Sequence, residues 1–165
     1  MRIHKTCITL VCCSLATKSW MAKLKPKITV AQFKQLSEEQ MPFASAMGLE
    51  LMQINDADVQ MRAHYSEKFL RPGGTLSGPI MMALADAAMY ALVLSKIGPV
   101  ELAVTTNLSI NFLRKPLPGD ILAEARMLKL GKRLAVGEVT LYSEGESVDK
   151  PVAHVTSTYS IPTQT

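Results

Sequence analysis

Hydrophobic and polar residues alternate with a period of two along four stretches in the second half of the chain, a pattern typical of strands with one apolar face. In the first stretch, 102–112, Val104, Leu108 and Phe112 alternate with polar residues. The other three are 121–130, 134–142 and 152–161, and turn-forming residues separate them. Four consecutive strands with short connections predict an antiparallel sheet.

The first half predicts a hairpin and a helix. Residues 49–54 and 59–65 indicate two strands around an Asn/Asp-rich turn. Residues 31–47 carry apolar side chains at roughly helical spacing, which predicts a short helix interrupted near Pro42. A turn-rich loop is expected over 71–79.

The stretch 76–96 predicts a long helix that is apolar on nearly all sides, ended by Gly98 and Pro99. Such a helix is typically buried. A membrane-spanning helix is not favoured, because the apolar segment is shorter than about 20 residues and has a carboxylate at its centre. One buried helix and about six antiparallel strands predict an α+β domain in which the sheet wraps over the helix.

Composition fits a single domain over 28–165, preceded by a basic extension over 1–27. The chain has 165 residues and a formal charge of +4, but six of its 18 Lys and Arg lie in the first 27 residues without a single Asp or Glu. The remaining 12 face all 14 acidic side chains. Because a nucleic-acid binder is expected to carry a basic face on its folded domain, we predict no nucleic-acid partner.

The three cysteines also lie in this extension, at Cys7, Cys12 and Cys13, so the predicted domain has no thiol for a disulfide, a metal or nucleophilic catalysis. Basic residues followed by the apolar stretch 8–16 outline a secretory signal. The alternative is that translation begins at Met21 and that the leader is an unstructured extension. We favour the second interpretation and expect a cytoplasmic protein.

Asp86 is the strongest candidate for a functional residue, because it lies in the middle of the apolar helix. An ionised carboxylate in such a place must pair, take up a proton or border a wet cavity. The structural alternative is a buried Asp that is hydrogen-bonded to the backbone or to Thr and Asn side chains.

The start of this helix is a second candidate. Glycine at position 78 lets a ligand approach the backbone closely, and free N–H groups at a helix start stabilise a developing oxyanion. Asp86 lies eight residues beyond Gly78, or roughly 12 Å along the axis at about 1.5 Å per residue. The two cannot serve one reacting carbon within one subunit, so joint action requires a homodimer with antiparallel helices.

The chain resembles the hot-dog-fold acyl-CoA thioesterases, specifically the phenylacetyl-CoA thioesterase-like group, from about Ala44 to Ile161. The segments that carry the resemblance are 77–86, 103–116, 119–120 and 131–133. The usual motif of the family is His-Gly-Gly, six further residues, and then Asp or Glu in the central helix. Here Ser77-Gly78-Pro79 stands in place of His-Gly-Gly, and Asp86 falls at the carboxylate.

This resemblance implies a hot-dog fold, with an antiparallel sheet of five to six strands around the helix, and hydrolysis of an acyl-CoA thioester. Asp86 would act as general base or nucleophile, and Gly78 of the partner subunit would hold the carbonyl. Ser77 would replace a His that orients the thioester, and Thr105 would help to place the water. Because Pro79 has no N–H, the usual set of donors is incomplete.

The resemblance also assigns coenzyme A, as part of the substrate, to a group of basic residues at strand ends. No separate cofactor and no metal are predicted, and the expected partners are a small-molecule acyl-CoA and further copies of the chain in a dimer or tetramer. The predicted CoA-binding residues are Arg114, Lys115, Lys129, Lys132 and Arg133.

Two alternatives to this enzyme stay open. A hot-dog protein that binds acyl-CoA without turning it over is favoured by the absence of the motif His. An intact Asp86 favours the enzyme. A hot-dog dehydratase would need a catalytic His near the active helix, and none lies between Tyr65 and Val152.

Overall fold

The structure is a computed structural model, and it describes residues 25–163. The predictions for the leader over 1–20 and for Met21 therefore lie outside the described residues. From Lys27 onward the chain packs on the domain, since the backbone N–H of Lys27 donates to the carbonyl oxygen of Ser95 at 2.8 Å.

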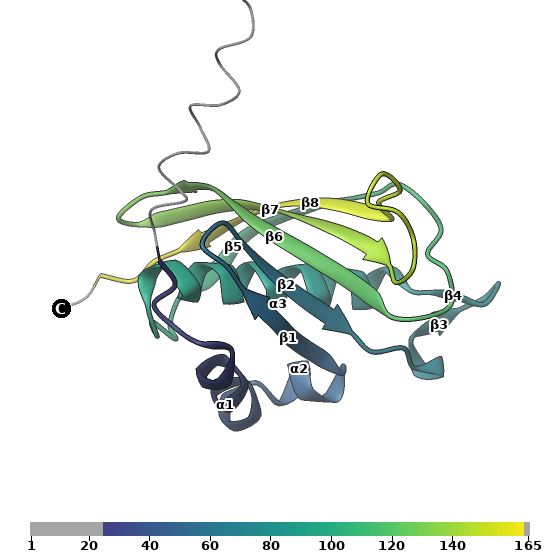
Figure 1. The fold of residues 1–165 in the computed structure, drawn as a ribbon, viewed down its shortest axis with the longest axis horizontal. Helices are drawn as coiled ribbons and strands as arrows, with labels where there is room; N and C mark the ends of the chain where they lie inside the picture. Colours follow the sequence, from purple (N-terminus) through teal and green to yellow (C-terminus); the bar gives the residue numbers. More distant parts are fainter. Residues whose placement is uncertain (1–24, 164–165) are drawn as a thin grey trace, which may run out of the picture.

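The N-terminal helix is interrupted at Pro42, as predicted. Helix α1 (Val30–Gln40) begins with a capping box in which Thr29 and Gln32 bond each other's backbone N–H groups. Pro42 then begins the short helix α2 (Pro42–Ala46), because proline suits a first helical position and not a helix interior. Figure 1 shows both helices beside β1, outside the sheet.

Helix α3 (Gly78–Ile97) forms the centre of the domain. It is long and apolar enough to cross a membrane by length and composition. Thirteen of its 20 residues are buried, however, and the sheet arcs over it (Figure 1). A buried core helix meets the same criteria as a membrane span, and α3 has this position in the fold.

The six predicted strands form one antiparallel sheet in the order β1-β2-β6-β7-β8-β5. Its inward side chains meet α3, and Gly137 lets Met89 approach, because a Cβ at position 137 would lie 2.6 Å from the Met89 sulfur. The strands are β1 (Leu49–Ile54), β2 (Asp58–Ala63), β6 (Ile121–Leu130), β7 (Leu134–Ser143), β8 (Ala153–Ser160) and β5 (Val104–Phe112). The predicted α+β hot-dog architecture is confirmed.

The loop before α3 is more regular than predicted. Two-residue strands β3 (Leu70–Arg71) and β4 (Thr75–Leu76) pair with each other around a tight turn, next to the single-turn 3₁₀ helix η2 (Glu67–Phe69). Gly73 and Gly74 have φ angles of 93° and 68°, which favour glycine. This small hairpin leads directly into the start of α3.

Strand β5 corrects one prediction. Its alternating pattern predicted one buried apolar face, but only Leu108 and Ile110 are half-buried, and the other seven residues of the strand are exposed. The physical reason is its place at the edge of the sheet, where no further described strand pairs with it. The apolar side chains of Val104 and Phe112 are 56% and 51% exposed.

Candidate active site

Asp86 lies halfway along α3, where the helix passes beneath the edge formed by β5 and β8. Its carboxylate is half-buried, and its Oδ1 accepts two hydrogen bonds. The Thr105 hydroxyl donates at 2.7 Å, and the Tyr159 hydroxyl lies 2.8 Å away. Among residues 25–163, no hydrogen bond reaches Oδ2. Asp86 thus shows two of the arrangements expected for a charge on an apolar helix. Its carboxylate is hydrogen-bonded to two hydroxyl groups, and it borders a cavity.

A bulge in β5 turns Thr105 toward the helix. Simple alternation places Thr105 on the face opposite to Leu108, which packs against the core. The register shifts between Thr105 and Asn107, so that Thr106 is an extra residue opposite β8. Thr105 thereby becomes the direct partner of Tyr159, and the two hydroxyls approach Asp86 together.

Sequence reasoning missed Tyr159. The available signal was the inward alternation of β8, in which Ala153, Val155, Ser157 and Tyr159 are buried. A phenol on a core face needs a partner for its hydroxyl, and Asp86 was a charge in the predicted core that also needed a partner. Burial, followed by the negative charge of Asp86, raises the pKa of the Tyr159 phenol well above its ordinary value, so Tyr159 stays protonated.

A cavity of about 350 Å³ opens beside Asp86. Tyr90 lies between two aromatic neighbours there, with ring centroids 6.2 Å from those of both Tyr159 and Phe33. The Tyr90 hydroxyl donates to the carbonyl oxygen of Glu101 at 3.0 Å. Besides Asp86, the cavity is lined by Leu36, Gln40, Met41, Tyr90, Glu101, Ala103, Val104, Thr105 and Tyr159.

The start of α3 lines a second cavity, of about 460 Å³. Ser77 is the N-cap residue, but its side chain makes no capping bond, so it satisfies none of the N–H groups of the first turn. Gly78 fits tightly beneath Phe112, because a Cβ at position 78 would lie 3.1 Å from the ring. The other lining residues are Arg71, Leu76, Met81, Leu113, Arg114, Lys115 and Pro116.

The two cavities share no lining residue and border different turns of α3. The Asp86 cavity contains the candidate base with its hydroxyl donors. The Gly78 cavity contains the helix start and three cationic side chains, Arg71, Arg114 and Lys115. Of the predicted catalytic residues, the structure brings Asp86 and Thr105 together and keeps Ser77 and Gly78 in a separate place.

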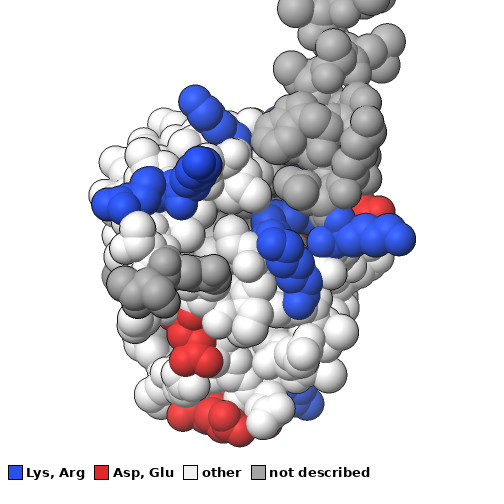
Figure 2. Space-filling view, turned by 90° about the vertical axis from the view of Figure 1, so that its left-hand side faces the viewer, with Lys and Arg blue, Asp and Glu red and all other residues white. Residues whose placement is uncertain are grey.

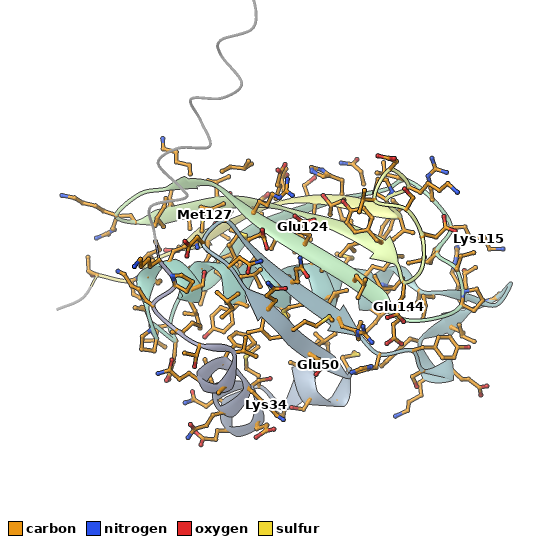
Figure 3. All side chains as sticks on the ribbon, in the orientation of Figure 1. Lys34, Glu50, Lys115, Glu124, Met127 and Glu144 are labelled. Atoms are coloured by element: carbon orange, nitrogen blue, oxygen red, sulfur yellow. The ribbon has the colours of Figure 1, made fainter. Side chains whose placement is uncertain are left out.

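The five predicted CoA-binding cations form two groups and not one cluster. Arg114 and Lys115 follow the end of β5, and Figure 3 shows Lys115 at the right-hand end of the domain. Lys129, Lys132 and Arg133 lie at the β6–β7 turn, at the opposite end of the sheet, because Leu134 and Val104 both pair with Ser160. Figure 2 shows that left-hand end, where most of the visible Lys and Arg lie over the upper and middle parts and most of the visible acidic residues lie lower.

Neither described histidine belongs to a metal-binding group. His64 lies between Glu50 and Asp120, at 2.9 and 3.3 Å, and His154 lies 3.3 Å from Glu138. Within the described part of the chain, no three His, Cys, Asp or Glu side chains are arranged to hold a metal ion.

Comparison with known proteins identifies similar chains. The model of the Thioesterase superfamily matches residues 73–150. A Silicibacter protein, provisionally assigned as a thioesterase, is 45% identical, with a TM-score of 0.76 over 85% of this chain and 96% of that one. A variant of the phenylacetic acid degradation protein PaaI from Thermus thermophilus is 28% identical, with a TM-score of 0.64 over 73% and 99%. The 1,4-dihydroxy-2-naphthoyl-CoA hydrolase of Listeria monocytogenes is 24% identical, over 66% of this chain and 88% of that one.

Proposed function

The chain belongs to the thioesterase superfamily, and we propose that it hydrolyses an acyl-CoA thioester to the free acid and CoA at a site shared between two subunits. Thioester hydrolysis is the reaction that family membership indicates. The acyl-CoA substrate, the role of Asp86 and the shared site are our proposal. The observation that carries it is a half-buried Asp86 that borders a cavity and keeps one carboxylate oxygen without a hydrogen-bond partner among residues 25–163.

In the general-base route, Oδ2 of Asp86 accepts a proton from a water molecule while the water oxygen attacks the thioester carbonyl carbon. The carbonyl oxygen gains the negative charge of the tetrahedral intermediate. When that intermediate collapses, the carbon–sulfur bond breaks, CoA leaves as a thiolate and takes up a proton, and the acid is released. Thr105 contacts the carboxylate and borders the same cavity, which supports a role in placing the water.

The nucleophilic route begins with attack by the carboxylate oxygen itself. It forms a mixed anhydride and expels the CoA thiolate, and water then hydrolyses the anhydride. Both routes need Asp86 ionised and its free oxygen accessible from the cavity.

The developing oxyanion is proposed to bond the backbone N–H of Gly78. This donor points out of the first turn of α3, where the partial positive charge of the helix dipole adds to the effect. Pro79 contributes no N–H. Ser77 lies beside this donor and offers a short neutral hydroxyl, which can both donate and accept, in place of the motif His.

Because Gly78 and Asp86 are roughly 12 Å apart along one helix, we assign the two halves of each site to different subunits. The exposed edge of β5 and the exposed apolar side chains of Val104 and Phe112 support a twofold contact along this strand. Antiparallel pairing of two β5 strands would bring the start of one toward the end of the other. Asp86 would then approach the Gly78 cavity of the second subunit.

The phosphate groups of CoA are proposed to bind Arg114 and Lys115, which line the cavity that contains Gly78. Lys129, Lys132 and Arg133 stay predicted contacts for the outer part of CoA. A tetramer built from two dimers, a cytoplasmic location and the absence of a metal or separate cofactor also stay predictions.

A binding protein without turnover is the second candidate, and the observation that favours it is Ser77-Gly78-Pro79 in place of the usual His-Gly-Gly. Such a protein would bind acyl-CoA and release no thiol. The ionisable Asp86 beside a cavity favours the enzyme, because a group that only binds an acyl chain gains nothing from a buried charge.

The decisive experiment measures free-thiol release from a panel of acyl-CoAs by wild type and by Asp86→Asn. We expect the substitution to lower kcat by at least about 10²-fold, since the amide cannot act as a base, while the melting temperature stays close to that of wild type. Equal turnover by the two folded proteins would contradict the mechanism. Saturable acyl-CoA binding without thiol release by wild type would identify the binding protein instead.

A further inference from the structure

Tyr159 is the least exposed side chain at the Asp86 site, with 2% of its surface accessible. Its hydroxyl lies 2.8 Å from Oδ1 of Asp86 and 3.1 Å from the backbone carbonyl oxygen of the same residue. A phenol has one proton to donate, and the ionised carboxylate is the stronger acceptor. Tyr159 therefore contacts the proposed base without lying open to solvent.

Both hydroxyl donors bind the same carboxylate oxygen, and they come from neighbouring strands. Thr105 and Tyr159 are direct partners across β5 and β8, and both reach Oδ1. A carboxylate that is free to rotate about its Cβ–Cγ bond presents its two oxygens in turn. Two donors on Oδ1 restrict that rotation. They leave Oδ2 as the oxygen that can accept a hydrogen bond from the attacking water.

The ring of Tyr159 is held by contacts that do not need its hydroxyl. It stacks on Tyr90 with centroids 6.2 Å apart and an interplanar angle of 29°, and it belongs to the buried core. The hydroxyl group can therefore be removed with the ring still packed, which separates a role in catalysis from a role in folding.

We propose that Tyr159 is a positioning residue for the hydrolysis, which acts by donating to Oδ1 of Asp86 and so presents Oδ2 to the attacking water. This inference rests on the proposed function, because it needs Asp86 to be the group that activates water or attacks the thioester. Tyr159 itself takes no proton from the substrate and forms no bond to it. A phenol is protonated at neutral pH, and burial with the charge of Asp86 raises the pKa of Tyr159 further, so that it remains a donor in alkaline solution as well.

The test compares Tyr159→Phe with wild type in the thiol-release assay, together with the melting temperature of each protein. We expect kcat to fall about 10-fold with KM nearly unchanged, because a hydrogen bond to a charged group is lost while the cavity keeps its shape. A purely structural role would lower the melting temperature and leave the kcat of the folded protein unchanged.

Tyr142→Phe is the matched control. It removes the same atom from a half-buried tyrosine on β7, and no hydrogen bond of its hydroxyl is found among residues 25–163. We expect it to keep the kcat and the KM of wild type. The double variant that combines Tyr159→Phe with Thr105→Val should lower kcat by a factor that differs from the product of the two single effects, because the two hydroxyls share one acceptor oxygen.

Failure of this inference differs from failure of the proposed function. If Asp86→Asn abolishes turnover while folded Tyr159→Phe keeps the kcat of wild type, Tyr159 is structural and the inference is wrong. If Asp86→Asn itself keeps full activity, the proposed function is wrong and Tyr159 has no base to position. A loss of kcat in Tyr159→Phe that Tyr142→Phe reproduces would also contradict positioning through Asp86.

Discussion

The two cavities along α3 differ in nearly every property that matters for thioester hydrolysis. The Asp86 cavity provides a carboxylate with two hydroxyl donors, and Glu101 adds a second acidic side chain. The Gly78 cavity has a helix start and three cations, with no acidic residue in its lining. One suits the activation of water, and the other suits an oxyanion and phosphate groups. Each lacks what the other has, which is why we propose that the two cavities are complementary halves of a site shared between subunits, called half-sites below.

The largest expected effect comes from separating the half-sites. Ser109 lies on the exposed β5 edge, so Ser109→Glu would place like charges close together where two such edges pair. We expect the dimer to weaken and turnover to fall at least about 10²-fold at concentrations where the monomer dominates, because a lone subunit lacks one half of each proposed site, with recovery as the protein concentration rises. Sedimentation and thiol release measured over the same concentration series test this.

Thr156→Glu is the control for that experiment, because Thr156 is the exposed β8 partner of Ser109, one strand away from the edge. This substitution adds the same negative charge, but the new side chain would not lie directly opposite its own copy in the second subunit. The dimer should therefore persist. A monomeric Ser109→Glu protein with full activity would show that one subunit contains a complete site.

An intermediate effect is expected from recombining damaged half-sites. Asp86→Asn removes the proposed base, and Gly78→Val crowds the helix start against Phe112. Each variant alone should be nearly inactive. In a mixed dimer, one site contains both substitutions and the other contains neither. Because half of the dimers in a random equal mixture are mixed, the mixture should recover about a quarter of wild-type activity.

Two differently tagged chains, co-expressed and purified as the mixed species, make this recovery measurable by thiol release. The mixed dimer alone should reach about half of wild-type activity, because one of its two sites is intact. No recovery in a stable mixed dimer would contradict the shared site, because Asp86 and Gly78 would then have to act together within one subunit.

The smallest expected effect concerns the cations. Arg114→Glu with Lys115→Glu should raise KM for an acyl-CoA about 10-fold with a smaller change in kcat, because the two residues line the Gly78 cavity. Lys132→Glu with Arg133→Glu changes the net charge equally at the opposite end of the sheet, and a smaller rise in KM is expected.

An acyl thioester of N-acetylcysteamine, which carries no phosphate, provides the substrate control. Neither charge reversal should change its KM. If the β6–β7 pair has the larger effect on acyl-CoA, the phosphates bind there and not beside Gly78.

Most of the fold could be predicted because its elements are encoded locally. The apolar stretch around Asp86 predicted α3, the helical spacing over 31–47 predicted a short N-terminal helix interrupted near Pro42, and period-two alternation predicted the strands of the sheet. The site was less predictable. Asp86 is visible as a charge on an apolar helix, but the role of Thr105 depends on the bulge at Thr106, which changes the face that each residue presents.

Tyr159 shows the same limit of prediction from sequence. It follows Asp86 by 73 residues, and nothing in the alternation of β8 indicates that its hydroxyl ends at Oδ1 of that carboxylate. The five predicted CoA-binding cations show the opposite error. They were predicted to form one group, but the direction of the strands places them at opposite ends of the sheet.

The sequence by itself determined that the protein has a buried helix with one carboxylate, an antiparallel sheet and a glycine at the helix start, because these features rest on periodicity and on the chemistry of single residues. Only the tertiary structure decided which hydroxyls reach Asp86, which cations accompany Gly78, and that two separate cavities exist. These facts depend on strand order, register and a bulge. Such features are set by the packing of distant segments against α3 and not by any local stretch of chain.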